Sequence, residues 1–219
     1  MGHGVSAHFA ENRQKDSSTL KAKAIEQVRS LIRGEDLQAG DRWTGLEEEK
    51  EKVQAEIDAV IGRDRPPSLT DKAQMPFTEA TIMEVQRMTV VVPLSVPHMA
   101  SDTTVFQGYT IPKGSVVLAN LWAVHRDPKV WEKPNDFNPS RFLDEHGQIL
   151  KKEAFIPFGI GRRVCMGEQL AKMELFLMFV NLMQMYKFNF ADETFKPMLE
   201  GRFGLTLAPY PFEIKITSR

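Results

Sequence analysis

The glycine-rich loop of residues 158–167 (FGIGRRVCMG) constrains this chain more than any other stretch. It contains Cys165, the only cysteine among 219 residues, and it precedes an apolar run over residues 168–186 that has the composition of a buried helix. A single cysteine excludes an intrachain disulfide and any zinc or iron–sulfur site built from several cysteines. The chemistry of Cys165 therefore depends on one sulfur atom and its surroundings.

Three features of this loop favour a thiolate at Cys165. Gly159 and Gly161 permit unusual backbone dihedral angles and the close approach of a neighbour. A helix that begins just after the cysteine turns unpaired N–H groups toward the sulfur, and Arg163 adds a cation. Such surroundings favour the thiolate, the form of a cysteine that binds a metal. The alternative interpretation is packing, because a lone cysteine is usually buried and inert.

The composition excludes several classes of function. A formal net charge of −1 argues against binding to nucleic acid or to a strongly anionic membrane by bulk electrostatics. No apolar stretch reaches the ~18 residues of a membrane-spanning helix, and the N-terminus lacks the apolar segment of a signal peptide. We therefore expect a soluble chain without a membrane anchor.

Hydrophobic periodicity predicts a mainly α fold with small β-sheets, of the α+β class. Residues 1–45 form a separate N-terminal segment, expected to be disordered at its start, and residues 46–219 form the folded region. Helices are expected over residues 18–33, 46–61, 78–88, 121–126 and 168–186. Hairpins are expected between 105–111 and 115–118, with a turn at 112–114, and between 204–207 and 212–216, with a turn at 209–211. Residues 131–148, rich in Pro, Asn and Asp, indicate ordered irregular chain.

Five residues of the loop match the pattern F-x-x-G-x-R-x-C-x-G: Phe158, Gly161, Arg163, Cys165 and Gly167. This pattern resembles the haem-binding loop of the cytochrome P450 superfamily. The resemblance implies that Cys165 is the axial iron ligand of haem b (iron protoporphyrin IX), a ligation that favours O–O cleavage. It also places Phe158 in the cofactor-binding loop and Arg163 against a haem propionate.

Two further motifs resemble elements of the same superfamily. Glu84 and Arg87, three residues apart on one helix face, are similar to its E-x-x-R helix, and Arg141 in FNPSRF is similar to its P-x-R-F element. The resemblance implies that these three residues form a buried structural triad, since a bidentate Arg–carboxylate pair has a fixed geometry. Without it, Glu84 and Arg87 would be an ordinary surface ion pair contributing about 0.2–0.5 kcal/mol.

The resemblance extends over residues 46–219 and includes the margins of a substrate pocket. The run VVPLSVPH is similar to the segment after the E-x-x-R helix, which implies that His98 hydrogen-bonds the other haem propionate. Residues 201–209 (GRFGLTLAP) resemble a hairpin tip that borders the pocket. Residues 69–94 and 155–179 resemble the microsomal family two, subfamily U, whose members hydroxylate long-chain fatty acids. The apolar segments 91–96 and 203–207 are compatible with an acyl chain.

The activity that the resemblance implies is that of a haem-thiolate monooxygenase, which uses oxygen to hydroxylate a lipophilic small molecule. Electrons would come from an NADPH-dependent flavoprotein reductase, docked on a basic surface that includes Arg162 and Lys172. Full-length relatives associate with the endoplasmic reticulum (microsomal) membrane, whereas this chain alone is expected to be soluble, on the cytoplasmic face. No nucleic-acid partner is expected.

The sequence departs from the family pattern on the oxygen side of the haem. Residues 1–45 contain no A-G-x-D-T-T-like run, the acid–Thr pair of the distal helix, so no catalytic residue is assigned. We therefore expect the C-terminal half of the cytochrome P450 fold, incomplete, with weak haem binding and impaired oxygen activation. Two alternatives are a non-enzymatic family remnant that binds partners without stable haem, and a Cys–His nucleophilic enzyme, for which the sequence pairs no histidine with Cys165.

Overall fold

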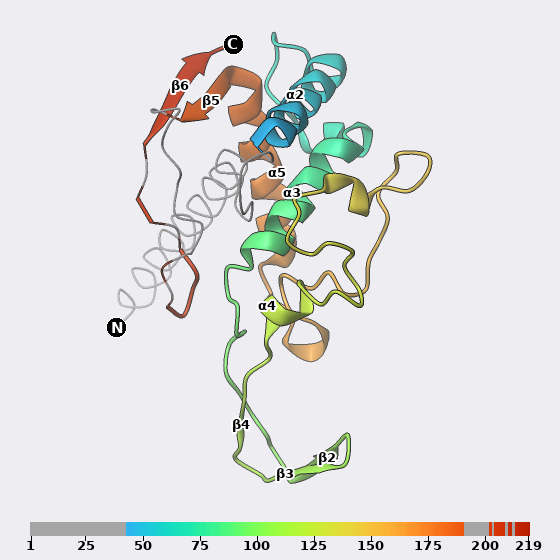
Figure 1. Ribbon diagram of the computed structural model, residues 1–219, viewed down its shortest axis with the longest axis vertical. Coiled ribbons are helices and arrows are strands. Elements are labelled where there is room, and N and C mark those ends of the chain that lie inside the picture. The colour runs from blue at the N-terminus through green and yellow to red at the C-terminus, as the bar shows by residue number, and fades with distance from the viewer. Residues whose placement is uncertain (1–42, 191–201, 203, 209, 212) are drawn as a thin grey trace, which may run out of the picture.

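The computed structural model combines a helical body with a long arm of short strands (Figure 1). The arm consists of residues 98–117. It describes residues 43–190, 202, 204–208, 210, 211 and 213–219. The helices are α2 (Trp43–Val60), α3 (Pro76–Thr89), α4 (Leu121–Val124) and α5 (Glu168–Met185), with 3₁₀ turns η1 (Leu69–Gln74), η2 (Pro139–Phe142) and η3 (Gly161–Arg163). The strands are β1 (His98–Met99), β2 (Thr104–Phe106), β3 (Tyr109–Ile111), β4 (Val116–Val117), β5 (Tyr186–Phe190) and β6 (Ile214–Ser218). The predicted α+β class is confirmed; the helix expected over residues 18–33 lies outside the described residues.

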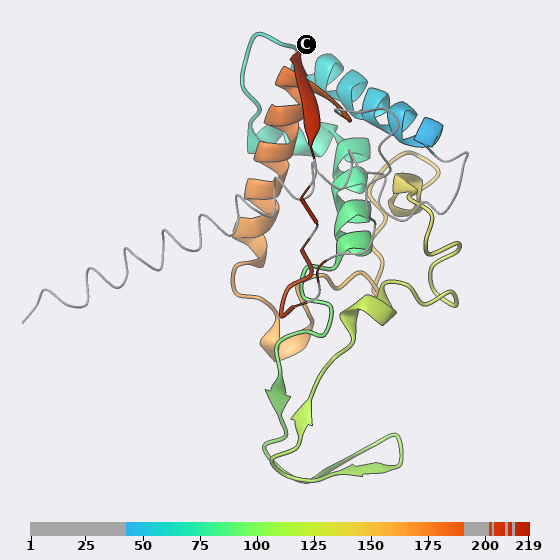
Figure 2. The ribbon, with the colours of Figure 1, turned by 60° about the vertical axis from the view of Figure 1, so that its left-hand side comes forward.

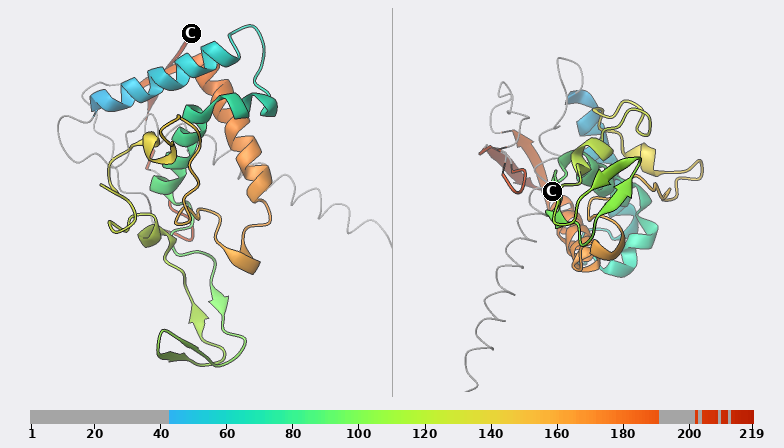
Figure 3. Two further views of the ribbon diagram at one scale, coloured as in Figure 1. Left: turned by 90° about the vertical axis from the view of Figure 1, so that its right-hand side faces the viewer. Right: turned by 90° about the horizontal axis from the view of Figure 1, so that it is seen from below.

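The core lies between α2, α3 and α5. Helix α2 lies across the ends of α3 and α5 that are farthest from the arm (Figures 2 and 3). Every residue of α5 from Leu175 to Met183 is buried or half-buried, as its nearly continuous apolar sequence predicts. None of the described helices combines the length and the apolar content needed to cross a bilayer. Helix side chains buried in this core are Val53 and Ile57 of α2, Ile82 and Val85 of α3, and Phe176, Phe179, Val180 and Met183 of α5.

Local chemistry sets the junction between α2 and α3. Gly62 ends α2 because its φ of 76° is a left-handed conformation, from which its N–H donates back to the carbonyl of Ile57 at 3.2 Å. Pro76 opens α3, where its missing N–H costs nothing. The carboxylate of Glu56 on α2 then accepts the backbone N–H groups of Phe77 at 3.0 Å and Thr78 at 2.7 Å. An acidic side chain of one helix therefore caps the positive end of the next.

The pairing of the strands in the arm differs from the predicted hairpin. β2 pairs antiparallel with β3, and the turn between them is Gln107-Gly108, not residues 112–114. Both turn residues have positive φ, 50° and 84°, the geometry whose twist matches that of a two-residue hairpin. The chain does turn at 112–114, where the N–H of Ser115 donates to Pro112 at 3.1 Å, but β4 then pairs with β1. The prediction that 115–118 pairs with 105–111 is therefore wrong.

The predicted C-terminal hairpin is also wrong. β6 pairs antiparallel with β5, which follows α5 directly, and Arg202 forms an isolated bridge with Ala208. The sequence YKFNF alternates aromatic and polar side chains with the period of a strand, and this buries Phe188 in the helical core. The core contact of Phe188 places β5 where β6 can pair with it. Of the predicted hairpin, residue 209 in the turn and residue 212 in the second strand lie outside the described residues.

The Glu56 cap is testable by substitution. Glu56→Ala should lower the free energy of unfolding by about 1 kcal/mol, because the first turn of α3 loses its acceptor. Urea denaturation of the full chain measures this change. The control Glu51→Ala, at an exposed position on the same helix, should change stability by less than about 0.5 kcal/mol. Equal effects of the two substitutions would show that Glu56 is not a cap.

Candidate thiolate site

Cys165 lies at the solvent-exposed end of a loop that is closed onto the start of α5. Gly159 and Gly161 have φ values of 80° and 75°, a left-handed conformation that strains any side chain with a Cβ. The N–H of Cys165 donates to the carbonyl of Phe158 at 3.0 Å, and the N–H of Glu168 donates to the carbonyl of Cys165 at 3.2 Å. The two glycines therefore shape the loop, and the backbone on both sides of the cysteine is fixed.

The surroundings of the sulfur fit a flat, apolar group with its own metal. Four apolar side chains near Cys165 in the sequence are exposed: Ile160, Val164, Met166 and Leu170. Among the described residues no cluster of three or more His, Cys, Asp or Glu side chains could hold a metal ion. One exposed sulfur with apolar neighbours suits a metal whose other ligands come from a macrocycle. The donor set therefore fits haem and does not fit a metal bound by several side chains.

A buried ion network between α3 and η2 joins the three residues of the predicted triad. Arg87 donates to both carboxylate oxygens of Glu84, through Nε at 2.8 Å and Nη2 at 2.9 Å, and neither side chain is exposed. Arg141 of η2 donates through Nε to Glu84 Oε1 at 3.0 Å, and the backbone N–H of Asn138 reaches the same oxygen at 3.0 Å. Glu84 and Arg87 are therefore not an exposed surface ion pair, which was the alternative interpretation. The network fastens the irregular stretch around η2 to α3.

The two predicted propionate partners lie on separate elements of the structure. His98 is half-buried in β1, and Arg163 is exposed at the end of η3. Neither side chain has a hydrogen-bond partner among the described residues. Phe158 is half-buried, and Lys172 Nζ lies 5.9 Å from its ring centroid. In Figures 1 and 2, η3 lies at the end of the helical body from which the arm leaves.

His125 is a site residue that the sequence interpretation missed. It is fully buried after α4, where Nδ1 lies 2.8 Å from the carbonyl of Leu121 and Nε2 accepts the backbone N–H of Ile156 at 3.0 Å. Its own carbonyl accepts from Arg87 Nη1 at 2.8 Å. Burial lowers the pKa of His125; the Leu121 hydrogen bond opposes this shift, and the positive charge of Arg87 adds to it. The one sequence signal was a histidine amid apolar residues before the Asp-Pro turn.

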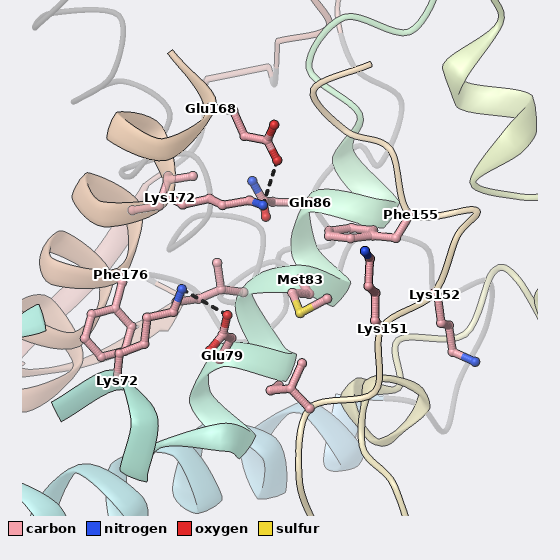
Figure 4. A pocket seen from close by; sticks show the side chains of 13 residues that line it. Lys72, Glu79, Met83, Gln86, Lys151, Lys152, Phe155, Glu168, Lys172 and Phe176 are labelled. Carbon is pink, nitrogen blue, oxygen red and sulfur yellow. Dashed lines mark ion pairs between the residues drawn. The ribbon is translucent and has the colours of Figure 1, made fainter. Parts of the chain in front are cut away.

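A hollow of about 410 Å³ lies between α3, α5 and residues 149–155 (Figure 4). Its floor is apolar, and its rim carries more lysines than acids. Two lysines are paired: Lys72 with Glu79 at 2.9 Å and Lys172 with Glu168 at 2.7 Å. The other two are Lys151 and Lys152, on the segment that leads to the cysteine loop. Lys172, predicted to be part of a basic surface, therefore lines a cation-rich hollow, whereas Arg162 lies outside it on η3.

The structure thus contains an exposed thiol in a glycine-constrained loop and a buried Glu–Arg–Arg network. The chain belongs to the cytochrome P450 family, whose model matches residues 47–216. It is 71% identical to cytochrome P450 2U1 of Homo sapiens over 170 residues, 78% of this chain and 31% of that protein. It is 68% identical to cytochrome P450 2U1 of Rattus norvegicus over the same length, 32% of that protein.

A more distant relative, cytochrome P450 2J1 of Oryctolagus cuniculus, is 51% identical over 165 residues, 75% of this chain and 32% of that protein. The chain thus spans about a third of the length of the curated relatives it matches. Haem is the cofactor that membership of the family implies.

The buried network makes a sharp prediction about stability. Glu84→Gln should lower the free energy of unfolding by about 3–5 kcal/mol, because two buried guanidinium groups lose their countercharge. Glu79→Gln, on the same helix, is the matched control, since it removes an ion pair with Lys72 that is partly exposed. It should cost at most about 1 kcal/mol. Thermal or urea unfolding of both variants measures the difference, and similar losses would contradict the role of Glu84 as the centre of the network.

Proposed function

We propose that Cys165 is the axial thiolate ligand of a haem b iron and that this chain forms the cysteine side of a haem-thiolate monooxygenase site. The observation that supports this most strongly is the exposed sulfur at the end of a loop fixed on both sides by backbone hydrogen bonds. When bound, the haem would supply a redox-active iron for oxygen chemistry, with electron density donated by the thiolate.

The residues of the chain have separate roles in this proposal. Gly159 and Gly161 shape the loop through their positive φ values. Arg163, exposed at the end of η3, and His98, half-buried in β1, would each bind one propionate. The exposed apolar side chains in and next to the loop, Ile160, Val164, Met166 and Leu170, would pack on the macrocycle.

We propose further that oxygen activation by this chain alone is impaired. The described residues leave Cys165 open to solvent, and residues 1–45 contain no A-G-x-D-T-T-like run that would hold a proton donor on the opposite side of the haem. A macrocycle covered on one face loses part of the apolar contact that retains it. Haem binding should therefore be weak, and hydroxylation slow or absent.

The substrate and the redox partner are proposals of the same kind. A lipophilic substrate, with a long-chain fatty acid as the candidate, is supported by the exposed apolar side chains of Val96 and Leu205 in the two segments expected to border the pocket. A flavoprotein reductase with an acidic surface would fit the cation-rich hollow and Arg162. The resemblance to microsomal relatives supports the endoplasmic reticulum membrane as the location.

A second candidate function is that of an interaction protein without stable haem. The observation that favours it is the arm, which exposes large apolar side chains on short strands: Val105 (67% exposed), Phe106 (61%), Tyr109 (78%) and Val116 (65%). Exposed apolar surfaces of this kind mark sites of protein association. A Cys–His nucleophilic enzyme gains no support from His125, because both of its ring nitrogens are engaged by Leu121 and Ile156.

A carbon-monoxide difference spectrum tests the proposal. The full chain, produced with a haem precursor, reduced and treated with carbon monoxide, should show the long-wavelength Soret band of a thiolate ligand. Cys165→Ala should lose the band, and Val130→Ala, at an exposed apolar side chain outside the loop, should keep it. A folded chain by circular dichroism that retains no haem would favour the interaction protein. A band that survives Cys165→Ala would overturn the assignment of the ligand.

A further inference from the structure

A continuous path of hydrogen bonds joins the buried ion network to the cysteine loop, and His125 is its central link. Arg87, whose guanidinium grips Glu84, donates through Nη1 to the carbonyl of His125 at 2.8 Å. The ring of the same residue accepts the N–H of Ile156 at 3.0 Å. The carbonyl of Ile156 then accepts the N–H of Gly159 at 3.0 Å, which closes a turn over residues 156–159. The carbonyl of Phe158, within that turn, accepts the N–H of Cys165 at 3.0 Å.

The protonation of the ring follows from its two partners. A backbone N–H can only donate, so Nε2, which receives the N–H of Ile156, carries no proton. A carbonyl can only accept, so Nδ1, at 2.8 Å from Leu121 O, carries the proton of the neutral imidazole. The arrangement therefore requires one tautomer of one charge state. A protonated ring has two N–H groups and would meet Ile156 donor to donor.

Packing keeps the ring in this orientation. His125 is 0% exposed, and its ring is stacked at 6.3 Å on Trp131 and lies edge-on to Phe155 at 5.9 Å. Trp131 Nε1 in turn donates to the carbonyl of Val124 at 2.9 Å, which closes the stack onto α4. If Nε2 were protonated, the N–H of Ile156 would lose its acceptor, and water could not take that place without disturbing these rings.

We propose that His125 is a positioning residue for the cysteine loop: its neutral, Nδ1-protonated imidazole fastens Ile156 to the Glu84–Arg87 pair and thereby fixes the backbone that presents Cys165. The anchoring of the loop follows from contacts within the chain. Its service to a haem iron rests on the proposed function.

The charged groups near the ring make this anchor sensitive to acid. The positive charges of Arg87 on α3 and of Arg126 next in the chain both lower the pKa of His125, while burial is the largest cause; Trp131 and Phe155, which pack on the ring, carry no charge. Because the pKa in the folded chain is below the ordinary value of 6.5, the unfolded state binds more protons between the two values. The anchor is complete above that ordinary value and is lost as the pH falls through the lowered one.

Two substitutions separate the acceptor from the rest of the side chain. In His125→Gln the side-chain carbonyl reaches the position of Nε2 and can accept from Ile156. In His125→Asn the shorter amide reaches the position of Nδ1 and can donate to Leu121, but the N–H of Ile156 loses its acceptor. His146→Asn, at a side chain that is 78% exposed, is the control for removing a histidine.

The measurement is the hydrogen-exchange protection factor of the Ile156 amide in the full chain without haem, corrected for intrinsic exchange rates. Protection should stay near the wild-type value in His125→Gln and His146→Asn and fall by about tenfold in His125→Asn, the loss expected for one buried hydrogen bond. As the pH falls from about 7.5 through the lowered pKa of His125, wild-type protection should fall while that of His125→Gln should not. Equal protection in Gln and Asn variants, or wild-type protection independent of pH, would overturn the proposal.

Two further outcomes keep this proposal apart from the proposed function. If His125→Asn fails to fold, the pH dependence of wild type against His125→Gln still decides. A wild-type chain that retains no haem but shows the expected protection refutes the thiolate-ligand assignment and leaves the anchor standing. If a folded His125→Asn variant keeps the thiolate band of the wild type and the protection of its Ile156 amide is unchanged, the anchor is refuted. The ligand assignment then stands.

Discussion

The rest of the site depends on the hydrogen bonds that the buried carboxylate of Glu84 accepts. A charge buried this completely persists only when its hydrogen-bonding capacity is filled, and here two arginines and the N–H of Asn138 fill it. The arginines then use their remaining N–H groups on backbone carbonyls, Arg87 on His125 and Arg141 on Glu132 and Asp136. One buried charge therefore orders irregular chain that has no sheet or helix to hold it.

That order matters because the stretch from α4 to the cysteine loop has few regular elements. It includes η2 and η3, each a single short turn, and a small aromatic cluster in which Trp131 and Phe142 are buried. Ring packing of Phe142 on Trp131 and Phe155, at 5.7 Å and 5.0 Å, supplies the apolar half of the support. The polar half runs through Glu84, Arg87 and His125 to the backbone of the loop. Under the proposed function, the two together hold the backbone that presents the sulfur of Cys165 to the iron.

The sequence predicted the parts of this structure that depend on local patterns. The apolar run before Tyr186 predicted a buried α5, and hydrophobic periodicity over residues 46–61 and 78–88 predicted α2 and α3, because each pattern depends on residues close in the chain. The pairing of β6 was mispredicted because it depends on a partner far away in the chain: β6 pairs with β5, whose place is set by Phe188 in the core. His125 was missed because its value lies in contacts with Arg87 and Ile156, at 38 and 31 positions' separation, which no local pattern records.

The central claim, that a loop held by this buried network presents one sulfur to haem iron, is tested most directly by X-ray absorption at the iron edge. Spectra of the haem-loaded full chain should contain one sulfur in the first coordination shell of the iron, and Cys165→Ser should replace it with a light atom. An iron coordinated only by nitrogen and oxygen in the wild-type chain would contradict the account, since Cys165 is the only cysteine that could supply the sulfur.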